Sequence, residues 1–205
     1  MEIIASDIMQ QVLAACNAYD ENAYTTADVK QALLQEHLTP KGFAALLSPA
    51  AAPLLEQLAH RAQAETRRHF GNAVNLFTPL YIANYCENYC IYCGFNCRNK
   101  IKRARLTAAE IEQEMQAIAA QGLEEILLLT GESPAMSDVR YIGDACRLAR
   151  KYFRVVGLEV YPMDSADYAY LHQCGADFVT VFQETYDPDK YGQLHLGGRK
   201  RIFPY

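Results

Sequence analysis

The chain has 205 residues, of which 51% are hydrophobic, and it carries a formal net charge of −5. This length accommodates one domain, or one domain with a helical appendage, and the composition can fill a core. The acidic balance argues against binding to nucleic acid or to anionic membranes, which normally requires a basic excess. Four of the seven cysteines fall within twelve residues, unlike the spread of a disulfide framework, and this clustering predicts a metal site.

The sequence contains no pattern typical of export or of a membrane span. Its first residues combine neither a basic segment nor an uninterrupted apolar segment, so no secretory signal is expected. The longest apolar stretch, residues 43–59, is interrupted by Ser48, Pro49, Pro53 and Glu56. We therefore expect a cytoplasmic protein.

Residues 1–72 are expected to form an N-terminal helical region. Apolar residues recur at helical spacing in three stretches, residues 4–18, 29–38 and 51–69. Thr25 or Thr26 can cap the second of these helices.

From residue 73 onward, short apolar runs alternate with helical patterns. The runs that predict strands are residues 74–83, 125–130, 155–161 and 178–182, and the helical patterns between them are residues 107–121, 138–152 and 165–173. Repeated strand–helix units predict a parallel α/β sheet, either doubly wound or part of a (β/α)8 barrel. Because a complete barrel needs roughly 250 residues, we expect residues 73–205 to form a partial (β/α) barrel of about four parallel strands.

The clustered cysteines follow the first expected strand. Cys86, Cys90 and Cys93, spaced C-x3-C-x2-C, can bind three irons of a [4Fe-4S] cluster and leave the fourth open to an amine and a carboxylate. The alternative is a zinc-binding, non-catalytic module with Cys97 as fourth ligand. The cysteines of zinc sites usually come as paired C-x2-C knuckles, so a single loop after a strand favours the cluster. Cys97 is then expected to be a small side chain that is partly buried and binds no metal.

The other three cysteines, Cys16, Cys146 and Cys174, fall on helical patterns and are expected in the core. The five histidines show no metal-ligand spacing. The sequence does not indicate which role His195 has.

Four segments carry a resemblance to a known family. They are TPLYIANYCENYCIYCGFNCRNKIKRARLT at 78–107, LLLTGESP at 127–134, LEVYPM at 158–163 and VFQETYDPDKYGQLHLGG at 181–198. The first resembles the cluster loop of radical S-adenosylmethionine enzymes, including the aromatic Tyr92 before the third cysteine. Together they are similar to the tyrosine lyase branch, the 2-iminoacetate synthases of thiamine biosynthesis, over residues 38–201.

The resemblance implies the following chemistry. A [4Fe-4S] cluster reduces S-adenosyl-L-methionine, and the resulting 5′-deoxyadenosyl radical attacks L-tyrosine. Cleavage of the Cα–Cβ bond gives 2-iminoacetate (dehydroglycine) and 4-cresol. Thiazole synthase would receive the imine, and flavodoxin or ferredoxin would supply the electron. The rival within the branch is the maturase that makes carbon monoxide and cyanide for [FeFe]-hydrogenase, but it has an additional C-terminal cluster domain and fits the HLGG segment less well.

Polar residues at the ends of the later strands are candidate ligands. Gly131 and Glu132 match a family motif that implies contacts to the amino group of S-adenosylmethionine, although an ordinary turn would look the same. Glu159 interrupts an apolar run and is expected to face either a ligand or solvent. Gln183 and Glu184, past the fourth strand, are candidates for a polar wall that contacts substrate, or for capping a loop.

The cluster loop continues into a basic run of five cations, Arg98, Lys100, Lys102, Arg103 and Arg105. Most runs of this kind are solvated faces. The sharper interpretation is a docking surface for an acidic electron donor.

Comparison with the family also predicts that this chain ends earlier than other family members. Family members continue past the HLGG segment with further strands and helices, whereas here Arg199 stands where a proline is expected. We therefore expect a C-terminally truncated chain of doubtful activity. A parallel sheet left open in this way would have an unpaired edge that favours aggregation.

Overall fold

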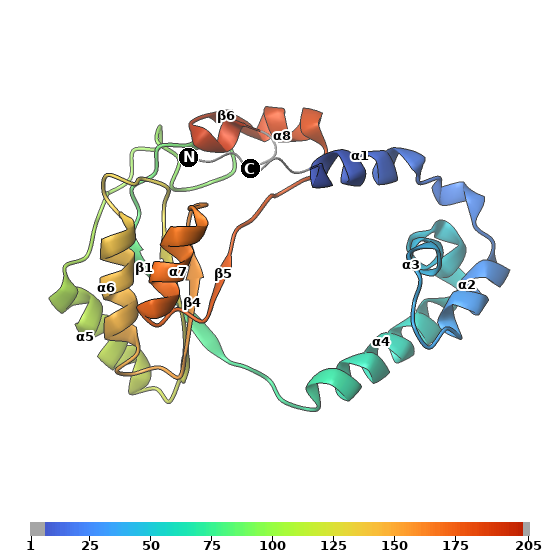
Figure 1. The fold of residues 1–205 in the computed structure, drawn as a ribbon, viewed down its shortest axis with the longest axis horizontal. Helices are drawn as coiled ribbons and strands as arrows, with labels where there is room; N and C mark the ends of the chain where they lie inside the picture. Colours follow the sequence, from blue (N-terminus) through green and yellow to red (C-terminus); the bar gives the residue numbers. More distant parts are fainter. Residues whose placement is uncertain (1–6, 203–205) are drawn as a thin grey trace. The chain divides into compact units, whose positions relative to one another are not determined.

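The structure is a computed structural model that describes residues 7–202. The chain divides into two compact units, Glu2–Val74 and Asn75–Tyr205. The first is built of helices and the second contains the strands (Figure 1). The division lies two residues after the boundary expected at residue 72. Within residues 7–202, no helix combines the length and apolar character needed to cross a membrane.

The N-terminal unit consists of four α-helices and two short 3-10 helices in its described part. They are α1 (Ile8–Ala18), η1 (Glu21–Ala23), α2 (Thr26–Leu33), α3 (Pro40–Leu47), η2 (Pro49–Leu54) and α4 (Leu55–Phe70). Thr25 caps α2 in a capping box with Asp28. Helix α4 begins later than expected, because Pro49 and Pro53 hold the preceding residues in η2. The start of the helix expected at residues 4–18 lies outside the described residues.

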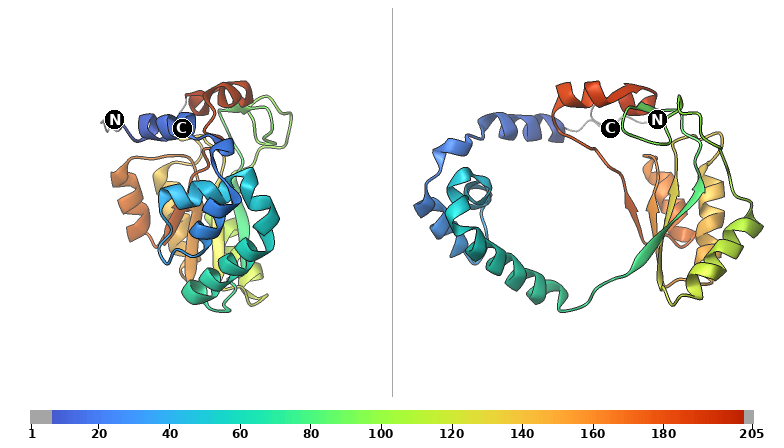
Figure 2. Two further views of the ribbon diagram at one scale, coloured as in Figure 1. Left: turned by 90° about the vertical axis from the view of Figure 1, so that its right-hand side faces the viewer. Right: turned by 180° about the vertical axis from the view of Figure 1, so that it is seen from behind.

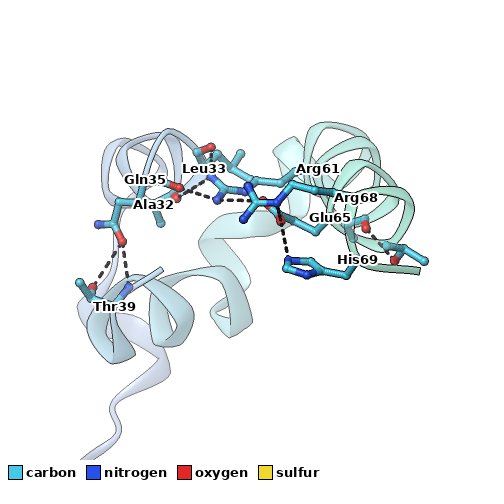
Figure 3. Close-up of polar contacts among 10 residues, drawn as sticks. Ala32, Leu33, Gln35, Thr39, Arg61, Glu65, Arg68 and His69 are labelled. Atoms are coloured by element: carbon cyan, nitrogen blue, oxygen red, sulfur yellow. Dashed lines mark hydrogen bonds and ion pairs between the residues drawn. The ribbon is translucent and has the colours of Figure 1, made fainter. Parts of the chain in front are cut away.

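A small core and one partly buried arginine hold this unit together. The core consists of Val29, Ala45, Ala51 and Leu54. Arg61 of α4 donates hydrogen bonds to the carbonyl oxygens of Leu33 and Gln35 at the end of α2, and pairs with Glu65 at 3.6 Å (Figure 3). The arginine thus satisfies carbonyl groups that a helix end leaves open.

The second unit contains a four-stranded parallel sheet. Its strands are β1 (Phe77–Ala83), β3 (Glu125–Thr130), β4 (Val155–Glu159) and β5 (Phe178–Thr180), in the order β1-β3-β4-β5. The connecting helices α5 (Ala108–Ala119), α6 (Val139–Ala149) and α7 (Ser165–Gln173) cover one face (Figures 1 and 2). The expected partial α/β barrel of about four parallel strands is confirmed.

Three of the four strands are shorter than their apolar runs, whereas β3 matches its run. Val74 and Leu76 precede β1 and are exposed, while Val160 and Tyr161 follow β4 and stay buried without joining the ladder. The apolar run after residue 178 likewise stays in the ladder only to Thr180. Apolar residues continue past the ends of β4 and β5 because the chain there lines a cavity.

The helix-facing side of the sheet forms the main core. Alternate strand residues pack against the three helices, among them Leu80, Ile82, Ile126, Leu128, Val156 and Leu158. Cys146 and Cys174 belong to this core, as expected. The same expectation for Cys16 is wrong, because α1 has no buried residue and the thiol is exposed.

A second, two-stranded element joins residues far apart in sequence. Strand β2 (Tyr89–Cys90) pairs antiparallel with β6 (His195–Gly197), which follows helix α8 (Pro188–Leu194) and precedes η3 (Arg199–Arg201). Figure 2 shows α8 and β6, in red, beside the green loop that follows β1. These short elements were not expected from the sequence.

Candidate functional site

A cavity of about 350 Å³ lies at the carboxyl ends of the parallel strands. Its floor is one row of the sheet, in which Tyr81, Leu129, Glu159 and Thr180 are register partners across β1, β3, β4 and β5. Alternation turns these residues away from the helices, since successive side chains point to opposite faces of a strand. The sheet thus gathers the strand ends around one space, as is typical of ligand sites in parallel α/β proteins.

Cys86, Cys90 and Cys93 all line this cavity. Cys90 is buried in β2, and the other two are half-buried. Asn96 holds the loop by donating hydrogen bonds to the carbonyl oxygens of Cys90 and Cys93, at 3.3 and 3.1 Å. Burial raises the pKa of the Cys90 thiol to about 11, so binding of iron must also remove this proton.

The spread of the three thiols bears on which metal group they fit. Within the described residues, no three His, Cys, Asp or Glu side chains lie close enough to share one ion. A zinc ion requires thiolates about 2.3 Å from one point, whereas cluster thiolates bind different irons. A loop of three cavity-facing thiols therefore fits a cluster better than a single zinc ion.

Cys97 does not join the other three cysteines. It is exposed, and its amide donates to the carbonyl oxygen of Asn88 at 2.8 Å. The expectation of a partly buried residue is therefore wrong, because the turn after Cys93 brings the Cys97 thiol to solvent. The structure does not bring Cys97 to the cavity as a fourth ligand.

The end of β3 meets the cysteine loop at Gly131 and Glu132. Glu132 is 6% exposed. Its carboxylate accepts a hydrogen bond from the side-chain amide of Asn88 and lies 3.8 Å from the Arg199 guanidinium. Its carbonyl oxygen also accepts from the Glu87 amide at 2.8 Å. An ordinary strand-ending turn does not require a buried carboxylate with these partners.

Two further carboxylates reach the cavity. Glu159 is half-buried in the row described above, and burial, together with the nearby Glu184, raises the pKa of Glu159 above its usual value. Glu184 lines the cavity, has a positive φ of 75° and pairs with Lys200 at 2.8 Å. The structure brings Glu184 to the cavity but not its neighbour Gln183.

Tyr92 and His195 form a contact that sequence reasoning missed. The Tyr92 hydroxyl lies 2.7 Å from Nε2 of His195, and the two rings meet edge to face. Tyr92 lines the cavity, while His195 is fully buried beside it. Burial raises the pKa of Tyr92 and lowers that of His195, so both side chains are favoured in their neutral forms. The only sequence signal for this contact was the position of His195 in a family-like segment.

The side chains of the basic run differ in their contacts and in their exposure. Arg103 donates to the carbonyl oxygens of Asn84, Phe95 and Asn96, and Arg105 lies 3.9 Å from the Tyr141 ring centroid. Arg98 likewise stacks over the Tyr89 ring. Arg98, Lys100, Lys102 and Arg105 are exposed, and Arg103 is half-buried. Four of the five cations are therefore solvated, and their role as a docking surface for an electron donor stays a prediction.

Comparisons with known proteins agree on one family. Residues 80–203 match the family model described as "Radical SAM superfamily". The chain is 46% identical over 182 residues to the 2-iminoacetate synthase of Escherichia coli (strain K12), a match that covers 89% of this chain and 48% of that protein. It is 33% identical over 159 residues to the 3-methylornithine synthase of Methanosarcina acetivorans, covering 75% of this chain and 44% of that one.

A solved structure is similar over nearly the whole chain. The [FeFe]-hydrogenase maturase HydG from Carboxydothermus hydrogenoformans superposes with a TM-score of 0.82 at 26% identity, covering 96% of this chain and 47% of that one. The chain spans about half the length of the curated relatives it matches.

Proposed function

Because the chain belongs to the radical SAM superfamily, we propose that it carries the cluster-binding and cofactor-binding part of a tyrosine lyase of the 2-iminoacetate synthase type. The observation that carries the proposal is the cavity in which Cys86, Cys90 and Cys93 lie with Gly131 and Glu132. The 46% identity to a 2-iminoacetate synthase supports the choice of branch.

An enzyme of this type cleaves the Cα–Cβ bond of L-tyrosine and releases 2-iminoacetate (dehydroglycine) and 4-cresol. A reduced [4Fe-4S] cluster with S-adenosylmethionine supplies, when bound, the radical that starts this cleavage. The chain itself binds and orients the cofactor and the substrate, and it excludes water from the cavity. Cys86, Cys90 and Cys93 would hold three irons and leave the fourth to the amino and carboxylate groups of S-adenosylmethionine.

The cavity carboxylates would bind the ammonium groups of cofactor and substrate. Glu132 and the carbonyl oxygen of Gly131 can accept hydrogen bonds from the methionyl ammonium group, and Asn88 keeps the carboxylate in place. The further assignments are Tyr92 and Glu159 to S-adenosylmethionine, and Glu184 to the substrate. Gln183 receives no assignment, because it does not line the cavity.

The proposal includes partners and a compartment. Thiazole synthase would take the imine, and flavodoxin or ferredoxin would deliver the electron at the exposed Lys100 and Lys102, since both donors are acidic. A reducing compartment such as the cytoplasm keeps the cavity thiols free for iron.

Anaerobic reconstitution with iron and sulfide tests the proposal. The chain should bind about four irons and four sulfides. Release of 5′-deoxyadenosine and 4-cresol from S-adenosylmethionine and tyrosine would show that this part of the lyase is active by itself. Replacing Cys86, Cys90 and Cys93 together by serine should abolish iron uptake, whereas Cys97→Ser should retain it, because Cys97 lies outside the cavity. A colourless protein that keeps one zinc per chain would contradict the cluster.

A second candidate is supported by the structural similarity to HydG, which extends over 96% of this chain. A lyase of this maturase type would make carbon monoxide and cyanide. An assay for carbon monoxide, cyanide and 2-iminoacetate separates the two candidates. Release of 4-cresol with 2-iminoacetate, and without cyanide, supports the thiamine-type enzyme.

A further inference from the structure

His195 is a fully buried polar side chain to which the proposed function assigns no task. It stands at the start of β6, where it is the register partner of Cys90 in β2. A buried imidazole is costly unless both ring nitrogens find partners. Its contacts therefore indicate what the residue does.

Both nitrogens of the ring are hydrogen-bonded. Nδ1 lies 2.8 Å from the carbonyl oxygen of Tyr191, so this nitrogen carries the hydrogen. In the neutral ring Nε2 then accepts, and the Tyr92 hydroxyl at 2.7 Å donates to it. The Tyr191 ring packs against the imidazole, with ring centroids 4.0 Å apart and planes inclined by 33°.

These contacts act on the part of the loop between two cysteines. Tyr92 lies between Cys90 and Cys93, and the amide of Ile91 donates to the carbonyl oxygen of Leu194 at 3.0 Å. Backbone and side chains of the α8–β6 segment thus hold residues 90–92 at two points. Supporting contacts of this kind usually fix the geometry of metal ligands.

We propose that His195 is a positioning residue for the cysteine loop, linking the Tyr92 hydroxyl to the Tyr191 carbonyl and so holding Cys90 and Cys93 in place for a cluster. This inference rests on the proposed function, because it assumes that these cysteines bind iron. It adds a residue of the α8–β6 segment, about one hundred residues away in sequence, to the supports of the cluster loop.

Two substitutions separate the two hydrogen bonds of the ring. In His195→Asn the amide group takes the place of Nδ1, so it can keep the bond to Tyr191 but does not reach Tyr92. In His195→Gln the amide oxygen takes the place of Nε2 and can accept from Tyr92. His172→Asn is a matched control, because Nδ1 of His172 lies 2.9 Å from the Ala176 carbonyl oxygen in a contact outside the cavity.

Hydrogen exchange of the metal-free chain tests the positioning role directly. His195→Asn should speed amide exchange of residues 89–93 by about two- to tenfold, as expected for one lost hydrogen bond. His195→Gln should restore the rate of the original chain, and His172→Asn should leave it unchanged. Circular dichroism verifies that each variant is folded. Unchanged exchange in a folded His195→Asn chain would overturn the inference.

Iron retention tests the consequence for the cluster. After reconstitution, His195→Asn should lose iron to a chelator about two- to tenfold faster than the original chain. Tyr92→Phe should give a similar increase, and the double variant should add little, because both changes break one link. Equal loss from the Asn and Gln variants would overturn the link to Tyr92. If the original chain takes up no cluster, the proposed function fails, while the exchange experiment still decides the role of His195.

Discussion

At the scale of single residues, Gly131 determines how closely the end of β3 approaches the cysteine loop. A Cβ atom at this position would lie 2.3 Å from the carbonyl oxygen of Tyr85 and 3.0 Å from Cβ of Cys86. The Gly131 amide also donates to the carbonyl oxygen of Ala83 at 3.1 Å. A side chain here would push against backbone that cannot move cheaply, so glycine is required by close approach.

We therefore expect Gly131→Ala to displace the loop that carries Cys86. The overpacking should lower the free energy of unfolding by about 1–3 kcal/mol and reduce iron uptake on reconstitution. Urea denaturation and iron analysis measure the two effects. Gly192→Ala in α8 is the control, since no atom lies within 4 Å of its added Cβ. Equal stability of the two variants would contradict the close approach.

At the scale of elements, Asp177 connects the start of β5 to β4 and α6. Its carboxylate accepts from the Val156 amide at 2.8 Å and pairs with Arg150 at 2.5 Å, while its own amide donates to the Val156 carbonyl oxygen. Burial alone would raise the pKa of Asp177, but the Val156 hydrogen bond and the Arg150 charge lower it below its usual value.

A depressed pKa in the folded state makes this contact dependent on pH. The stabilisation is present above the unfolded pKa of about 3.9 and is lost as the pH falls through the lower folded pKa. Asp177→Asn should therefore destabilise the chain at pH 6 and flatten the loss of stability below about pH 4. Urea titrations across this range measure the effect. Asp144→Asn, which removes an exposed pair with Arg147, should change little.

The elements that could be predicted from the sequence are those long enough to show an apolar repeat of their own. Helices α5 to α7 and the four parallel strands repeat an apolar pattern that local residues fix, as Thr107 fixes the start of α5 through a capping box with Glu110. Strands β2 and β6 span two and three residues and depend on each other for pairing. No pattern of period two can appear in so few residues.

The same distinction applies to the candidate site. Cys86, Cys90 and Cys93 were predictable because their spacing is local, and Glu132 because strand ends converge at one edge of the sheet. The contact of Asn88 with Glu132 spans 44 residues, and that of Tyr92 with His195 spans 103. Such contacts follow from the tertiary path of the chain, which residue spacing does not encode.

At the scale of the whole molecule, the sheet of the second unit has an open face and two open edges. Within residues 7–202, β1 and β5 each have one paired neighbour in this sheet. On the face opposite the helices, Phe77 and Tyr81 are 56% and 51% exposed, and Phe178 is 49% exposed. Exposed apolar residues beside unpaired backbone favour association between copies of a chain.

We expect the purified chain to associate as its concentration rises, and Phe77→Lys to reduce this association. A lysine at the start of edge strand β1 would repel incoming strands, and it would lie beside its register partner Glu125 on β3, where opposite charges attract. Sedimentation velocity over a range of concentrations measures the change, and circular dichroism verifies the fold. Phe77→Leu, which keeps the apolar edge, should associate like the original chain. A monomer at every concentration would contradict the expected association. Equal association of Phe77→Lys and the original chain would show that copies meet through another surface.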